Sequence, residues 1–77
     1  MSETEAEVSR IRARLAELRR EEEQKLKALA ELQQFYLEAR SDEEREKVRL
    51  AVAEIRELSR KSRQEIRDLN QKLAKKQ

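Results

Sequence analysis

The sequence of 77 residues contains no glycine and no proline, the two residues that most often interrupt regular backbone structure. It also contains no cysteine, which excludes a disulfide framework, a zinc–thiolate site and a thiol nucleophile. The absence of histidine removes the commonest general base and the commonest metal ligand. We therefore expect no enzyme, no metal site, no cofactor and no small-molecule ligand.

Apolar residues are sparse as well: hydrophobic residues make up 36% of the chain and aromatic residues 3%. No apolar run approaches the roughly 20 residues that cross a bilayer, and the apolar faces are too narrow for a helix that lies on a membrane. We expect no membrane partner. The sequence does not indicate a compartment, and we expect a soluble chain, cytoplasmic when it is produced recombinantly.

Charged residues are abundant, at 47% of the chain, yet the net charge is only +2. Self-repulsion is therefore weak, and the charged residues are mostly Glu, Lys and Arg, which favour helices. They alternate with regularly spaced Leu, Ile and Val. This pattern predicts one small all-α domain rather than a disordered chain.

Two capping boxes, each a hydroxyl followed three residues later by Glu, indicate where helices begin. Ser2 with Glu5 forms the first, with Thr4 and Glu7 as an alternative, and Ser41 with Glu44 forms the second. We therefore predict one helical-hairpin domain over residues 1–77, with a helix over about 3–39, a turn at about 40–41 and a helix over about 42–76. Helices of nearly equal length suit an antiparallel hairpin.

Two other chain paths stay open at this point. Because no glycine marks the turn, one uninterrupted helix is an alternative to the hairpin. A break near Ser62 and Glu65 also fits a capping box, although the apolar pattern passes through that point without a shift in register.

The second predicted helix carries a strict heptad seam, with steps that alternate between four and three residues. Its apolar members are Val48, Val52, Ile55, Ile66, Leu69 and Leu73. Two hydroxyls, Ser59 and Ser62, occupy the seam positions in between. The strict spacing predicts left-handed supercoiling against partner helices.

The first predicted helix has a less regular seam. Glu22 stands where the next apolar residue is expected, and the pattern resumes at Leu26, which indicates a local phase shift. The predicted apolar members are Ile11, Leu15, Leu18, Leu26 and Leu29.

A fold at residues 40–41 brings Glu22 level with Ser59 and Ser62, so the polar gaps of the two helices coincide. We predict a buried polar layer in which the hydroxyls donate to Glu22 and a nearby cation neutralises its charge, because unpartnered buried polar groups are costly. In the alternative, the serines face solvent or bond to the carbonyl four residues earlier.

A two-helix hairpin leaves its seam open on one side, and association with other copies closes it. We expect the partner to be the chain itself, as a homotrimer or homodimer of hairpins. A basic stripe on the second helix comprises Arg49, Arg56, Arg60, Arg63 and Arg67. We interpret it as pairing with acidic residues of the first helix, and we expect no nucleic-acid partner.

Over its whole length the chain resembles de novo designed coiled-coil bundles, in which helical hairpins assemble around buried hydrogen-bond layers. The resemblance rests on the Ser41–Glu44 cap, a composition dominated by Glu, Lys, Arg, Ala and Leu, two predicted helices of nearly equal length and the two serines within the seam. It implies a structural function, assembly to a set oligomer state. The alternatives are a natural coiled-coil dimerisation or adaptor domain that binds a partner helix, and a hairpin that switches to one long helix.

Overall fold

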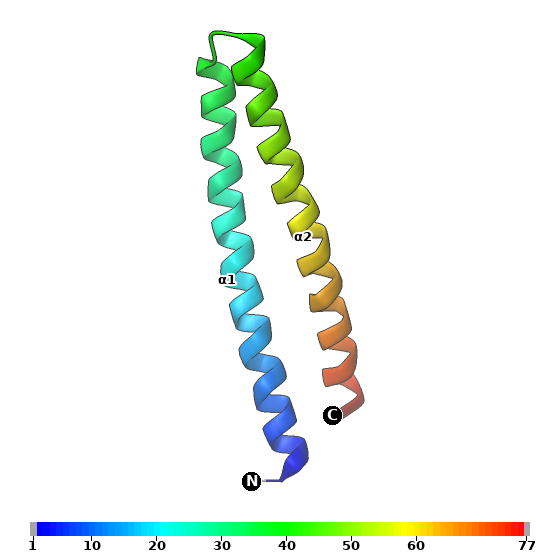
Figure 1. The fold of residues 1–77 in the computed structure, drawn as a ribbon. Helices are drawn as coiled ribbons and strands as arrows, with labels where there is room; N and C mark the ends of the chain where they lie inside the picture. Colours follow the sequence, from blue (N-terminus) through cyan, green and yellow to red (C-terminus); the bar gives the residue numbers. More distant parts are fainter. Residues whose placement is uncertain (1, 77) are drawn as a thin grey trace.

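The computed structural model describes residues 2–76 as two helices, α1 (Glu3–Glu38) and α2 (Asp42–Lys76), which pack against each other in an antiparallel hairpin (Figure 1). The predicted all-α hairpin is thereby confirmed. Neither alternative chain path occurs, since the chain turns after α1 and α2 continues unbroken past Ser62. The two ends of the chain lie at one end of a rod of 59 × 15 × 13 Å.

The first helix begins where the first capping box predicts. Ser2 is the N-cap, with extended backbone, and its hydroxyl accepts a hydrogen bond from the Glu5 amide at 3.1 Å. Glu3 and Glu5 place negative charge in the first turn, where it stabilises the positive end of the helix dipole.

The second helix is capped by Ser41, whose hydroxyl accepts from the Glu44 amide at 3.1 Å. The Glu44 carboxylate accepts in turn from the Arg40 amide at 2.9 Å, one residue before the N-cap amide that is the usual donor in a capping box. Arg45 closes the connection by donating to the Ala39 carbonyl at 3.3 Å and to the Asp42 carboxylate at 2.7 Å. Side chains at the start of α2 thus hold the end of α1.

The connection contains no residue in the left-handed region, which explains why it contains no glycine. Ala39, the C-cap of α1, has φ −61° and ψ 136°, an extended conformation open to any residue. No residue between 2 and 76 has a positive φ. The turn is therefore made by extended backbone and a strong cap rather than by a glycine.

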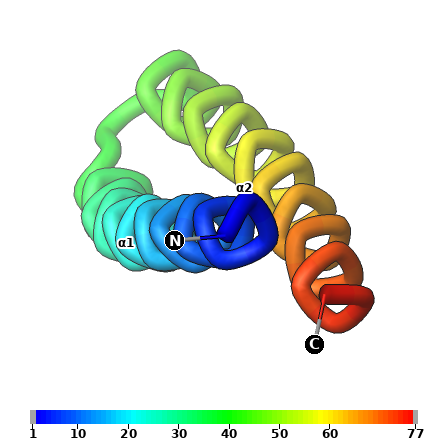
Figure 2. Tube along the Cα trace, turned by 90° about the horizontal axis from the view of Figure 1, so that it is seen from below, coloured from blue at the N-terminus to red at the C-terminus, as the bar shows by residue number. Residues whose placement is uncertain are grey.

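The helices remain side by side along the rod and wind around each other. Viewed along the long axis, α2 lies on one side of α1 near the connection and on another side near the chain ends (Figure 2). This shallow winding is what a heptad seam produces, because 3.5 residues per turn keeps the seam facing the partner helix.

The seam of α1 does not follow the predicted path. Leu26 is 65% exposed, whereas the side chain of its neighbour Lys25 is only 18% exposed. The heptad spacing therefore continues through Glu22 and Lys25 to Leu29 without a phase shift, and the prediction that placed Leu26 in the seam between the helices is wrong. The prediction failed because it followed the apolar residue where a lysine occupies the seam.

Burial is distributed unevenly along the rod. Of residues 2–76, four are buried, Leu15, Leu18, Ser59 and Ser62, and all lie in what we call the open half, residues 2–25 and 59–76. The large apolar side chains that are exposed all lie in the connection half, residues 26–58. They are Leu26, Phe35, Leu37, Leu50 and Leu58.

The cap at the connection is testable by Ser41→Ala. Because the hydroxyl satisfies the Glu44 amide, its loss should lower the free energy of unfolding by about 1 kcal/mol. Chemical denaturation followed by circular dichroism measures the change. Ser9→Ala, at an exposed position inside α1, should be neutral or slightly stabilising. Equal effects of the two substitutions would show that Ser41 does not act as a cap.

Candidate functional site

The middle of the hairpin holds a polar cluster between the helices. Lys25 Nζ donates to Ser62 Oγ at 2.7 Å and to Glu22 Oε1 at 3.1 Å. Ser59 and Ser62 are 5% and 9% exposed, and Glu22 is half-buried. The structure joins Glu22 to Ser62 through Lys25, where the prediction had both serines donating directly to the carboxylate. Ser59 is buried next to them, but within residues 2–76 it makes no hydrogen bond to Glu22 or Lys25.

Lys25 suits this place because its side chain has two parts. The aliphatic stem covers the seam, as a leucine would, while the ammonium reaches the polar atoms at the edge. The two small serines leave room for the stem on the opposite helix. Lys25 is the nearby cation that neutralises Glu22, as an ion pair within one turn of α1.

The best-packed part of the seam lies next to this cluster. Leu18 is 1% exposed and Leu15 is 4% exposed, and Arg14 spans one edge beside them. The Arg14 guanidinium makes two hydrogen bonds to Glu65, at 2.7 and 3.0 Å. A bidentate ion pair between the helices therefore covers that edge of the seam in the open half.

In the open half, two ion pairs between the helices each lower the pKa of the carboxyl group that takes part. The hydrogen bond from Arg14 lowers the pKa of the Glu65 carboxyl, and the same contact raises the pKa of Arg14. Farther out, Lys76 pairs with Glu7 and lowers the pKa of that carboxyl. Both carboxylates are thus stabilised in their ionised form.

The seam of the connection half is only half-buried. Its half-buried residues are Leu29, Leu32, Tyr36, Val48, Val52 and Ile55. The predicted seam residues of the open half, Ile11, Ile66, Leu69 and Leu73, are half-buried too, but they flank the buried leucines. The connection half therefore exposes an apolar strip that the single hairpin cannot cover.

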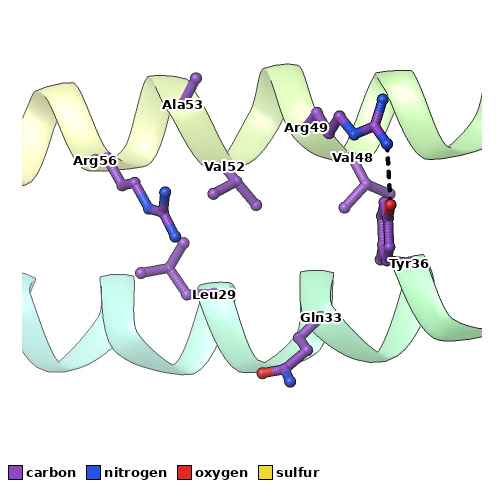
Figure 3. Close-up of a pocket in the computed structure, with 8 residues that line it drawn as sticks. All are labelled: Leu29, Gln33, Tyr36, Val48, Arg49, Val52, Ala53 and Arg56. Atoms are coloured by element: carbon purple, nitrogen blue, oxygen red, sulfur yellow. Dashed lines mark hydrogen bonds between the residues drawn. The ribbon is translucent and has the colours of Figure 1, made fainter.

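A groove of about 520 Å³ follows this strip. Figure 3 shows Leu29, Val48 and Val52 pointing into the space between the helices, with Arg56 above Leu29 at one end. At the other end Arg49 donates to the Tyr36 hydroxyl at 3.0 Å, and its guanidinium lies 5.6 Å from the ring centroid. The groove thus has an apolar floor and an arginine at each end.

The arginines of α2 do not pair with the acidic residues of α1 as predicted. Arg60 binds Glu57 through two hydrogen bonds, at 2.7 and 3.0 Å, and Arg49 binds Glu46 at 3.4 Å. These pairs span three residues of the same helix, a spacing that a helix brings together without help from its partner. Within residues 2–76, Arg56 and Arg63 form no side-chain hydrogen bond or ion pair.

The remaining features define no chemical site. Within residues 2–76, no group of three or more acidic side chains is placed to hold a metal ion, and neither helix is long and apolar enough to cross a membrane. Comparisons with protein-family models, with curated proteins and with solved structures found no match to this chain. The apolar groove and its surroundings are therefore the candidate functional site.

The difference between the halves can be measured by truncating one leucine in each. Leu18→Ala should lower the free energy of unfolding by about 2 to 4 kcal/mol, because the cavity forms at the most buried position. Leu50→Ala, at an exposed position of α2, should change the free energy of unfolding of the isolated hairpin by less than about 0.5 kcal/mol, so both variants are measured at a concentration at which the chain is monomeric. Urea denaturation compares the two. A larger loss from Leu50→Ala would contradict the burial pattern.

The Arg14–Glu65 pair predicts a pH dependence. Because the pKa of Glu65 is lower in the folded state, its stabilisation is present above the unfolded pKa of about 4.3 and is lost as the pH falls through the folded value. The fall in melting temperature from pH 7 to pH 3 should therefore be smaller for Glu65→Gln than for the unaltered chain. Glu54→Gln, an exposed carboxylate of the same helix, should keep the full fall. An equal fall in all three proteins would exclude the pair as a source of stability.

Proposed function

We propose that this chain is a structural self-assembly module, in which hairpins associate through the connection half into a coiled-coil homo-oligomer, a dimer or trimer of hairpins. The observation that carries the proposal is the confinement of all five exposed large apolar side chains to residues 26–58. Exposed apolar surface of this extent in one part of a molecule is typical of sites of association, and Leu26 and Leu37 share one face of α1, being about three helical turns apart. Assembly itself is the proposed role, as in the designed bundles that the sequence resembles.

The exposed area supports association. The chain exposes 6264 Å², whereas a compact monomer of its mass of 9.2 kDa is expected to expose about 4,900 Å². The excess of about 1,300 Å² is larger than the roughly 800 Å² that each partner contributes to a stable interface of standard size. A rod of two helices therefore has enough unused surface for one such interface.

The polar cluster supports a defined assembly. The hydrogen bond from Lys25 to Ser62 crosses between the helices and forms only in their present register, whereas the Lys25–Glu22 pair lies within α1. A slide of one helix along the other would remove the Ser62 acceptor and set the Lys25–Glu22 pair against larger apolar seam residues, which is costly. The cluster therefore sets how the hairpin closes, and the apolar strip drives association.

Light scattering coupled to size exclusion tests the proposal. The chain should elute with a mass of two or three times 9.2 kDa, and a mass of 9.2 kDa at 0.1 mM would refute self-assembly. Replacement of Leu26, Phe35, Leu37, Leu50 and Leu58 by Gln should weaken association at least tenfold while the helical content is retained, since less apolar surface leaves water.

The matched control places the same change in the open half. Ala13→Gln, Ala16→Gln and Ala74→Gln alter exposed positions of that half and should leave the oligomer mass unchanged. If this control dissociates the oligomer as well, association does not depend on the connection half.

A further inference from the structure

We infer that the partner on the groove is a second copy that runs antiparallel and overlaps only the connection half, related by a two-fold axis through the groove. This inference rests on the proposed self-assembly and adds the orientation and the extent of overlap. The axis passes between Arg49 and Ala53 on α2 and close to Gln33 on α1, three residues that line the groove (Figure 3).

A second stripe on α2, beside the groove, is self-complementary in this orientation. It follows alternating steps of four and three residues, so its members share one face, and it comprises Asp42, Glu46, Arg49, Ala53, Arg56 and Arg60. Asp42 and Glu46 lie toward the connection, Arg56 and Arg60 lie away from it, and Arg49 and the small Ala53 occupy the middle. An antiparallel copy therefore presents arginines where this copy presents carboxylates.

The pairs follow from the axis. Glu46 lies level with the partner subunit's Arg56, Asp42 lies level with the partner subunit's Arg60, and Arg49 lies level with the partner subunit's Ala53. Arg56 forms no ion pair within residues 2–76, and the Glu46 contact with Arg49 is long, at 3.4 Å. Both groups are thus available for a partner. The alanine lets the two α2 helices approach closely.

A stripe on α1 shows the same property with apolar residues. Leu26, Ala30, Gln33 and Leu37 are spaced by four, three and four residues, and reversal of the stripe sets Leu26 against the partner subunit's Leu37 and Ala30 against the partner subunit's Gln33. The centre of this stripe is within two residues of Gln33, the level of the α2 axis. Two of the most exposed leucines in the hairpin, at 65% and 71%, thereby cover each other.

The other arrangements do not pair the stripes in this way. In a parallel dimer, equal levels of the two copies meet across the two-fold axis, so Glu46 would face Glu46 and Arg56 would face Arg56. In a cyclic trimer each interface joins two different faces, so the stripe could not pair with its own reversed copy. An antiparallel dimer with full overlap would place the apolar strip of one copy on the charged open half of the other. The half-overlapping antiparallel dimer is the arrangement that matches both the apolar and the charged residues.

A charge swap tests the orientation. Glu46→Arg and Arg56→Glu should each weaken dimerisation at least threefold, and the double variant should restore it to within about twofold of the unaltered chain. The two residues are ten positions apart, about 15 Å along α2, which exceeds the Debye length of about 8 Å at physiological salt. Restoration therefore requires pairing between copies.

Disulfide trapping gives a second readout, undisturbed by native thiols because the chain contains no cysteine. A mixture of Leu26→Cys and Leu37→Cys chains should form the mixed disulfide, and neither variant alone should form its own. The particle should be roughly 90 Å long by small-angle scattering, since two rods of 59 Å overlap by about 19 residues.

The outcomes separate the two proposals. A wild-type mass of 9.2 kDa overturns self-assembly and this inference together. An oligomer in which the charge swap is not restored, or in which each cysteine variant forms a disulfide with itself, overturns the antiparallel overlap and leaves self-assembly intact. Restoration together with the mixed disulfide supports the arrangement described here.

Discussion

The bridge that Lys25 makes between Glu22 and Ser62 divides the hairpin into halves with different packing. On one side of the bridge, small serines face a lysine stem and Leu15 and Leu18 are buried, while the outer seam residues remain half-buried. On the other side, β-branched and aromatic residues line a groove that a single pair of helices leaves open. A hairpin of two long helices has one shared seam, so the side chains beside that seam gain burial only from another chain.

Much of the fold was predictable from the sequence because its signals are local. The cap at Ser41 sets the start of α2 through one hydroxyl and one amide three residues apart, and such contacts depend on the order of residues alone. The strict heptad on α2 likewise identifies the face that meets α1. Charged and apolar residues alternate along the chain, and glycine and proline are absent. The sequence therefore favours helices.

The prediction failed where two side chains could each have occupied the same position or formed the same contact. An apolar count favours Leu26 over Lys25, and only the unbroken alternation of three and four residues, carried through Glu22 and Lys25, would have identified the lysine as the seam residue. The arginines of α2 were assigned to α1, yet Arg60 takes its carboxylate from Glu57, since a partner one turn away costs less conformational entropy than one on another helix. The groove itself follows from packing between helices, which no local pattern specifies.

In the proposed dimer, the charged residues would select the orientation in which two copies associate. Surface ion pairs contribute little to stability, because solvent screens them and ordering long side chains is unfavourable. Their arrangement nevertheless discriminates between orientations, since a reversed stripe on α2 pairs opposite charges and a parallel one pairs like charges. In the proposed assembly the apolar strip supplies the driving force, the polar cluster favours the present register within each hairpin, and the order of Glu46 and Arg56 along α2 distinguishes one direction of approach from the other.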